Sequence, residues 1–441
     1  MLSAIKAVRG TRDLLPPETE IWNHIEATAR RVFARYAFGE IRTPIFEDTQ
    51  LFARGVGEET DIVSKEMYTW EDRARAQSEK AQMLTLRPEN TAGVVRAYIE
   101  HKLGDAGLLQ KLYYIGPQFR RERPQKGRYR QFFQIGAEVI GPASAGSESP
   151  LRDAEVLEML ATLLEELGII GWTLELNSVG SAIDRPRYVQ ALREALIDVA
   201  PSLCVDCQRR AETNPLRVLD CKVPEDQARI DQLPKIADFL DDASRAHFAA
   251  VREALDACGV PYTVNPRLVR GLDYYTRTTF EFIQGGLGAQ NALLGGGRYD
   301  GLSEAIGGPK APGIGFAIGA DRLVLTLQAQ VAQHEQTASL ADVYVAPLGL
   351  AQEAQALLLA RELRRAGLRV ELGDGTFRLK KSFEMGNKLA RCIVLFGEDE
   401  AQSGILTVKD FQTGEQTKAP RAGLPSLLKH INRTTSTAHI N

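Results

Sequence analysis

The spacing of apolar residues divides the chain into helical and extended segments. Residues 20–36 carry apolar side chains at helical intervals, which predicts an amphipathic helix. Residues 111–122 and 130–141 are two strand-like runs on either side of a basic, glycine-containing loop, so they predict an antiparallel hairpin. Residues 313–328 predict a strand, a glycine turn and a helix.

The same pattern predicts several domains. Residues 1–327 form a mixed α+β domain, which is interrupted by a mostly helical insertion at 184–257. A polar linker follows at 328–340. Strands alternate with helices over 341–425, which predicts a small α/β domain with mixed or parallel strands. We expect 426–441 to be a tail that is partly disordered.

Composition limits the class of protein. The 441 residues are 44% hydrophobic and 25% charged, as in ordinary globular proteins. The net charge of −3 means that any nucleic-acid contact must come from a local basic patch. No run approaches the roughly 18 apolar residues of a membrane span, so no membrane partner is expected. Five cysteines, an odd and sparse set, favour a reducing compartment and a cytoplasmic location.

Three of the cysteines are close together in sequence. Cys204 and Cys207 are separated by two residues, and Cys221 follows. Structural zinc sites use four ligands, and no further cysteine or histidine stands at a matching spacing. We therefore assign no metal here, and the sequence leaves open whether the cluster binds one.

The predicted hairpin loop is the most basic segment. Residues 120–130 hold six cations and one acid, with aromatic residues close by. Arginine forks match phosphate oxygens, so Arg120 could hold a triphosphate while Phe132 stacks a base. The loop could also contact a nucleic-acid backbone. A solvated basic hairpin is an equally good interpretation of the charge alone.

Other candidate residues are weaker on their own. Arg270 and the tyrosines after it could face an anion, although for this stretch alone core packing of the tyrosines is the favoured interpretation. Glu89 and Thr91 at a strand end suit an ammonium group, and an N-cap role for Asn90 or Thr91 is the equally good alternative. Neither a dinucleotide fingerprint nor a P-loop occurs in the sequence.

Taken in order, the motifs resemble those of class II aminoacyl-tRNA synthetases, and closely those of the histidyl-tRNA synthetase family. AVRGTRDLLPPE is similar to the family's N-terminal signature, and the segment around EIRTPIFED to motif 1. FRRERPQKGRYRQFFQIGAE resembles motif 2, and GIGFAIGADRL motif 3. LVRGLDYYTRTTFEF and LGGGRYDGL resemble the two histidine-specific motifs. The resemblance covers nearly the whole chain.

The resemblance implies an antiparallel catalytic sheet flanked by helices, a helical insertion and a C-terminal anticodon-binding domain. It implies a homodimer with Pro44 at the interface, and L-histidine, tRNA(His) and ATP with Mg²⁺ as substrates. The residues that would hold ATP are Arg120, Arg128, Phe132 and Arg322. The residues that would bind histidine are Glu89, Thr91, Gln134, Glu138, Tyr274, Tyr275 and Tyr299.

Within these sets, the resemblance implies particular roles. Glu89, Thr91 and Gln134 would hold the ammonium group, and Glu138 and Tyr275 would bond the two imidazole nitrogens. Arg270 would bridge the histidine carboxylate and the α-phosphate, which makes Arg270 and Arg120 the principal catalytic residues. Arg123 and Gln125 would contact the tRNA acceptor end.

Three alternatives remain at this point. A synthetase-like regulatory subunit of ATP phosphoribosyltransferase would lack the anticodon-binding domain and depart in the catalytic motifs. A generic RNA-binding protein would not need the histidine-specific motifs. A class II synthetase of another specificity would share motifs 2 and 3 but lack RGLDYY and GGGRYDG.

Overall fold

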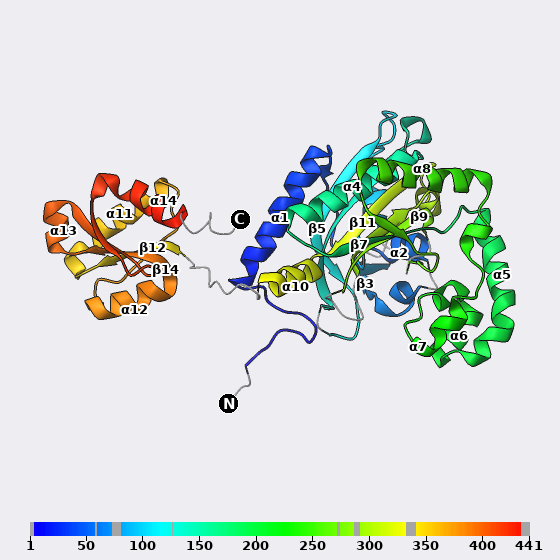
Figure 1. Ribbon diagram of the computed structural model, residues 1–441, viewed down its shortest axis with the longest axis horizontal. Helices are drawn as coiled ribbons and strands as arrows, with labels where there is room; N and C mark the ends of the chain where they lie inside the picture. Colours follow the sequence, from blue (N-terminus) through cyan, green and yellow to red (C-terminus); the bar gives the residue numbers. More distant parts are fainter. Residues whose placement is uncertain are drawn as a thin grey trace. The chain divides into compact units, whose positions relative to one another are not determined.

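The computed structural model describes residues 4–57, 60–72, 81–125, 127–270, 274–285, 292–331 and 341–433. The chain forms two compact units, 1–333 and 334–441, which are described separately (Figure 1). No helix among the described residues is long and apolar enough to cross a membrane.

An eight-stranded sheet is the centre of the first unit. The order is β1-β5-β6-β11-β10-β9-β7-β8, with parallel pairing only at the two outer pairs. The strands are β1 (Gly39–Glu40), β5 (Gln110–Phe119), β6 (Gln131–Ile140), β11 (Gly313–Gly319), β10 (Ala292–Arg298), β9 (Thr276–Gln284), β7 (Trp172–Ser178) and β8 (Tyr262–Val264). The predicted hairpin is confirmed, because β5 and β6 pair from Gln110↔Ile140 to Phe119↔Gln131.

The two faces of this sheet have different surroundings. Side chains alternate along a strand, so Ile135 and Val139 of β6 enter the main core, whereas Gln134 and Glu138 point to the other face. Four helices pack on the core face: α1 (Glu18–Arg35), α4 (Pro150–Glu166), α8 (Asp242–Cys258) and α10 (Ala320–Val331). The helix predicted at 20–36 is thus confirmed as α1.

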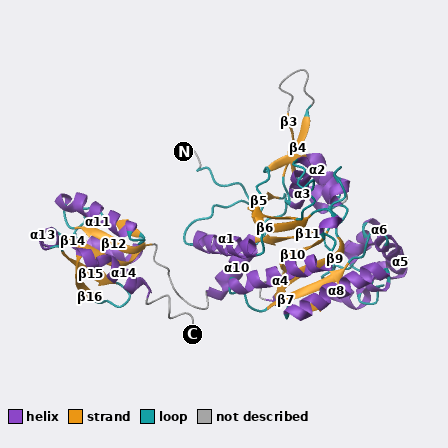
Figure 2. Cartoon of the chain, turned by 90° about the horizontal axis from the view of Figure 1, so that it is seen from above, coloured by secondary structure: helices purple, strands orange, loops and turns teal. Residues whose placement is uncertain are grey.

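Short elements cover part of the opposite face, on the side where Figure 2 shows α2 and α3. They are α2 (Thr49–Val56), α3 (Thr91–Glu100), α9 (Leu302–Ala305) and a small antiparallel sheet of β2 (Phe46–Asp48), β4 (Gln82–Leu86) and β3 (Tyr68–Asp72). Pro44 lies in the unpaired segment between β1 and β2, as expected for a residue that cannot donate to a ladder.

The insertion has a hydrophobic core of its own, formed by residues from Tyr188 to Leu240. Its helices are α5 (Asp184–Val199), α6 (Val205–Thr213) and α7 (Pro224–Ile230). Helix α8 falls within the expected range 184–257, yet its Val251 and Leu255 pack in the main core. A helix has the same spacing of apolar residues whether it packs in the insertion or in the main core. The sequence pattern therefore could not show that α8 belongs to the main core.

The second unit is a five-stranded mixed sheet in the order β13-β12-β14-β15-β16, with helices on both faces. The strands are β12 (Ala341–Pro347), β13 (Val370–Leu372), β14 (Ala390–Phe396), β15 (Ile405–Asp410) and β16 (Gln416–Pro420). The helices are α11 (Glu353–Arg365), α12 (Leu379–Leu389), α13 (Glu398–Ser403) and α14 (Leu424–Arg433). The small α/β domain is confirmed, with parallel pairs β12–β13 and β12–β14.

Two expected segments differ in the structure. The tail expected from residue 426 is helical as far as Arg433, because Leu424 and Leu428 of α14 are buried in the core of the second unit. Helix α10 continues to Val331, into the expected linker. The remainder of that linker and residues 434–441 lie outside the described residues.

Candidate active site

A cavity of about 890 Å³ lies on the face of the large sheet opposite the main core. Strands β6, β10 and β11, the loop after β5 and the insertion all contribute to its walls. Nearly all of the residues proposed from the sequence line it: Glu89, Thr91, Arg120, Arg128, Phe132, Gln134, Arg270, Tyr274, Tyr275, Tyr299 and Arg322. The topology therefore brings together residues that are more than 200 positions apart in sequence.

One end of the cavity holds arginines from the hairpin. The Arg120 guanidinium lies 5.2 Å from the centre of the Phe132 ring, and its Nε donates to the carbonyl of Pro88 at 2.9 Å. Glu122 lies 3.3 Å from Arg128 and 3.8 Å from Arg120. One carboxylate thus holds two cations at the mouth of the cavity without neutralising both.

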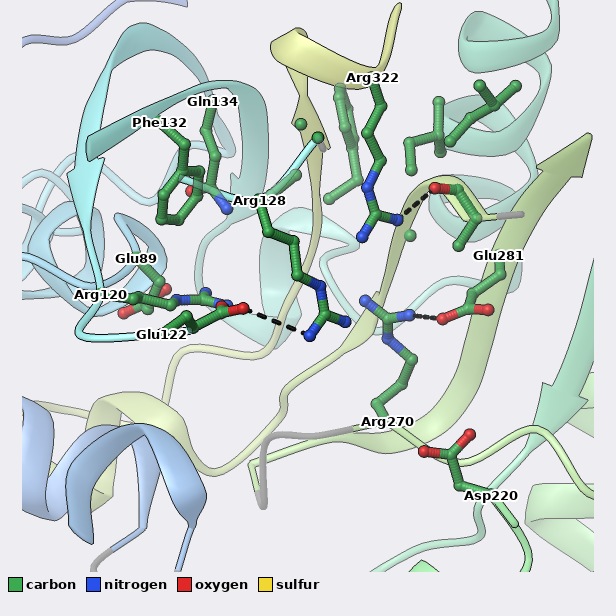
Figure 3. A pocket seen from close by; sticks show the side chains of 18 of the residues that line it. Glu89, Arg120, Glu122, Arg128, Phe132, Gln134, Asp220, Arg270, Glu281 and Arg322 are labelled. Atoms are coloured by element: carbon green, nitrogen blue, oxygen red, sulfur yellow. Dashed lines mark hydrogen bonds and ion pairs between the residues drawn. The ribbon is translucent and has the colours of Figure 1, made fainter. Parts of the chain in front are cut away.

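Arg270 enters the cavity from the opposite side. Its guanidinium pairs with Glu281 of β9, and Figure 3 shows it pointing into the same space as Arg128 and Arg322. Gly295 of β10 makes room for it, since a Cβ at that position would lie 2.7 Å from an Arg270 nitrogen. This contact explains one glycine of the GGGRYDG segment. Gly271, Leu272 and Asp273 lie outside the described residues.

Arg322, at the start of α10, has no carboxylate partner among the ion pairs of the described residues. It donates to the carbonyl of Ala292 at 2.5 Å. Burial, and next the charge of Arg128, lower its pKa. Crowded and partly buried guanidinium groups require an anion, so this end of the cavity suits a polyphosphate.

The other end of the cavity is acidic and buried. Glu89 accepts hydrogen bonds from the backbone N–H groups of Thr91 (2.7 Å) and Ala92 (3.0 Å). Glu89 thus caps helix α3, a role that the sequence interpretation gave to Asn90 or Thr91. Burial raises the pKa of Glu89. A cationic ligand would favour its ionised form.

Glu138 lies behind the wall of the cavity and is fully buried. Its two oxygens accept hydrogen bonds from the hydroxyls of Thr91 and Tyr299, each at 2.7 Å. Gly315 is its partner on the neighbouring strand β11, and a Cβ there would lie 1.7 Å from a Glu138 oxygen. Burial raises the pKa of Glu138 to about 8.

The raised pKa gives a stability prediction. Folded Glu138 keeps its proton up to about pH 8, whereas the unfolded side chain loses it near the ordinary glutamate pKa of 4.5. Its contribution to stability is therefore fully present below the unfolded pKa and is lost as pH rises through the folded pKa. In Glu138→Gln, the unfolding free energy should fall less steeply with pH than in the wild type between pH 5 and 8. The difference between the two slopes should reach about 1.4 kcal/mol per pH unit.

Tryptophan fluorescence during urea unfolding can measure this difference, because Trp22, Trp70 and Trp172 all lie in the first unit. If the unfolding free energy changed with pH in the same way in the wild type and in Glu138→Gln, the raised pKa of Glu138 would be contradicted.

Aromatic side chains complete the acidic end. The Tyr274 ring lies 4.7 Å from that of Tyr275 and 5.9 Å from that of Tyr299. Within the described structure, the buried side-chain carbonyl oxygen of Gln134 has no hydrogen-bond partner. An unpaired buried acceptor is costly, so it favours a ligand that donates a hydrogen bond there.

Arg123 and Gln125 are exposed in the hairpin loop and do not line the cavity. Backbone hydrogen bonds between Gln125 and Arg128 close the turn. Lys126 lies outside the described residues. The two residues are therefore available to a large partner at the mouth, not to a ligand deep in the cavity.

Several lining residues were not found from the sequence. Glu281 stands in an alternating strand, and only the fold pairs it with Arg270. The insertion contributes charged residues to the wall: Asp206, Arg210, Asp220 and Lys222. The sequence predicts a helical insertion here but not its contribution to the cavity, because a helical pattern gives no sign of which residues face a cavity in another part of the fold.

An antiparallel sheet with an arginine-lined cavity, a helical insertion and a separate α/β unit is the architecture of class II aminoacyl-tRNA synthetases. Residues 10–323 match the family described as histidyl-tRNA synthetase, and residues 342–431 match the anticodon binding domain. The chain therefore belongs to the histidyl-tRNA synthetase family.

Individual relatives agree with this assignment. A histidine–tRNA ligase from Koribacter versatilis is 71% identical over 97% of this chain and 96% of its own. One from Solibacter usitatus is 57% identical over 95% and 97%. The crystal structure of apo histidyl-tRNA synthetase from S. aureus is 36% identical with a TM-score of 0.76, covering 97% of this chain and all of that one. The regulatory-subunit alternative is less well supported, because the anticodon-binding domain is present.

Proposed function

We propose that the cavity carries out both reactions of a histidine–tRNA ligase. L-Histidine and ATP form histidyl-adenylate and pyrophosphate, and the histidyl group then passes to the 3′-terminal ribose of tRNA(His). The observation that carries this proposal is the division of one cavity into an arginine end and a buried acidic end. The first end suits a triphosphate, and the second suits an ammonium group and a small polar ring.

ATP would occupy the arginine end. Arg120 would hold the α-phosphate, Arg128 and Arg322 the outer phosphates, and Phe132 would stack the adenine. The lowered pKa of Arg322 supports this arrangement, because a phosphate would supply negative charge beside a guanidinium that burial and Arg128 disfavour.

Mg²⁺ would enter with ATP. Hard cations prefer carboxylate oxygens, and Glu122 and Glu281 line the cavity beside the phosphate-binding arginines. A carboxylate of this pair would offer an oxygen to the ion, alongside the phosphate oxygens of ATP. Bound there, Mg²⁺ would help to neutralise the charge on the phosphates.

Histidine would occupy the acidic end. Its ammonium group would bind Glu89, Thr91 and Gln134, which agrees with the unpaired carbonyl oxygen of Gln134. Glu138 and Tyr275 would read the imidazole, which offers one donor and one acceptor. Both Glu138 oxygens already accept a hydroxyl, so the imidazole N–H would use a second lone pair. Tyr274 and Tyr299 would enclose the ring.

The chemistry requires positioning more than proton transfer. The histidine carboxylate is already ionised, so it attacks the α-phosphorus without a general base, and pyrophosphate leaves. Arg270 would touch both the carboxylate and the α-phosphate, and it would stabilise the charge on the phosphorus in the transition state. In the second reaction a ribose hydroxyl attacks the acyl carbon, and AMP leaves.

The tRNA would contact both units. Arg123 and Gln125, exposed at the cavity mouth, would meet the acceptor end. The second unit would bind the anticodon, as its family match indicates. We place the reaction in the cytoplasm, where reduced thiols are the rule; all five cysteines are unpaired.

We further propose a homodimer that buries the small sheet. Phe46 of β2 and Trp70 of β3, the two outer strands of this sheet, are 53% and 39% exposed, and their rings lie 6.1 Å apart. An exposed aromatic pair beside Pro44 is suited to an interface. Light scattering should give twice 48.6 kDa for the wild type and a single chain for Phe46→Asp with Trp70→Asp.

A matched control for the dimer is Leu357→Asp, since Leu357 is 53% exposed on α11 of the second unit. This variant should remain dimeric. A monomeric wild type, or a double variant that stays dimeric while folded, would contradict the proposed interface.

The overall function is tested by charging. Unfractionated tRNA, labelled histidine and ATP should give labelled tRNA, and the other amino acids should give none. Charging with a different amino acid, or none from folded protein, would contradict the proposal.

A further inference from the structure

A cluster of potential metal ligands lies in the insertion, outside the residues that would bind ATP or histidine. Three cysteine sulfurs and one carboxylate oxygen all lie within 4.8 Å of one another: Cys204, Cys207, Cys221 and Asp226. The sequence showed the three thiols, and the fold supplies the fourth group from helix α7. We propose that these four residues bind one zinc ion.

The distances fit tetrahedral coordination. The sulfurs of Cys204 and Cys221 are 3.9 Å apart. Zinc–sulfur bonds of about 2.3 Å at tetrahedral angles place two sulfurs about 3.8 Å apart. The Cys221 sulfur lies 3.3 Å from Asp226 Oδ2, and the corresponding sulfur–oxygen separation around zinc is about 3.5 Å. Only small movements would form the site.

The surroundings of Asp226 favour a bound cation. This carboxylate is 3% exposed, and none of the ion pairs among the described residues includes it. Its partners are the N–H of Cys204, at 3.0 and 3.2 Å, and the thiol of Cys221. Buried charges are normally paired or coordinate metals, and a zinc ion would supply the missing positive charge.

The hydrogen bonds around the sulfurs support thiolate ligands. The backbone N–H of Val223 points to the Cys221 sulfur at 3.4 Å, and the N–H of Cys204 holds the carboxylate in place. In metal sites, hydrogen bonds from neighbouring groups to the ligands hold those ligands in the orientation that the ion needs. Three sulfurs select zinc over the hard cations Mg²⁺ and Ca²⁺, which prefer oxygen.

The cluster also has a position that matters to the enzyme. It joins the start of α6, the segment before α7 and α7 itself. Cys204, Cys221, Lys222 and Val223 line the same cavity as the ATP-binding arginines. Zinc would therefore hold one wall of the active site in shape, as a structural ion that takes no part in the reaction.

Metal analysis of the full chain tests the site without relying on activity. Protein purified with a thiol reductant and without chelators should contain about one zinc per chain. Metal-free protein titrated with Co²⁺ alone should develop the visible absorption of tetrahedral cobalt and a thiolate charge-transfer band. Histidine activation, measured on the same preparation, reports separately on the proposed function.

Four variants define the ligand set. Cys207→Ser and Asp226→Asn should weaken zinc binding by more than the roughly 10- to 100-fold typical of changes to outer partners. Asp226→Cys should retain the metal, because four thiolates also form a tetrahedral zinc site. Cys258→Ser is the control, since Cys258 is exposed and outside the cluster.

Three results would overturn the proposal. One is wild-type protein without zinc that also gives no cobalt absorption, a measurement that does not depend on whether a variant folds. Another is a disulfide between Cys204 and Cys221 in the native protein. The third is full zinc affinity in Asp226→Asn, which would remove the carboxylate from the ligand set.

Discussion

Replacing Arg270 with alanine should reduce histidine-dependent ATP–pyrophosphate exchange by about 10²- to 10³-fold, the loss typical when one preorganised donor to a developing charge is removed. Its guanidinium lies in the cavity between the two proposed substrates and is oriented by Glu281 and by the space that Gly295 leaves. The loss should be mainly in kcat, because the interaction strengthens as charge develops on the phosphorus.

Two variants separate this role from a general effect of charge. Arg270→Lys keeps the cation but not the planar fork, so it should also lose most of the activity. Arg252→Ala removes an exposed arginine of α8 that does not line the cavity, and it should leave exchange unchanged. Near-normal exchange by folded Arg270→Ala would remove Arg270 from the mechanism.

The second large effect should come from Gly315→Ala. The new methyl group would lie 1.7 Å from a Glu138 oxygen, so either the carboxylate or strand β11 must shift. Displacement of a binding group by about 1 Å can cost about 10²-fold, and we expect at least that loss in kcat/KM for histidine. The KM for ATP should change much less, because the arginines lie at the other end of the cavity.

Gly301→Ala is the matched control for this substitution. Nothing lies within 4 Å of a Cβ at Gly301, and its φ of −106° is open to any residue. Its kinetics should stay close to those of the wild type. Equal effects on the KM values of histidine and ATP in Gly315→Ala would contradict the assignment of Glu138 to the histidine end.

Much of the fold could be predicted from local patterns. The β5–β6 hairpin followed from two alternating runs around a basic loop, and α1 from its helical spacing. The motifs also identified eleven of the residues that line the cavity. These successes share a cause, because periodicity and motif are both properties of contiguous residues.

What could not be predicted depends on contacts between distant segments. The pairing of Arg270 with Glu281, and the close packing of Glu138 against Gly315, exist only once the strands are side by side. Asp226 joins three cysteines because α7 folds back on α6, and a carboxylate is too common in sequence to stand out as a ligand. The boundary of the insertion before α8 likewise depends on which core that helix enters.

The central claim is that this cavity activates histidine. ATP–pyrophosphate exchange with each of the twenty amino acids tests it most directly, since it measures the activation step without tRNA. We expect exchange with histidine alone, and its loss in Arg270→Ala. Exchange with another amino acid, or no exchange with any amino acid from protein shown to be folded, would contradict the account.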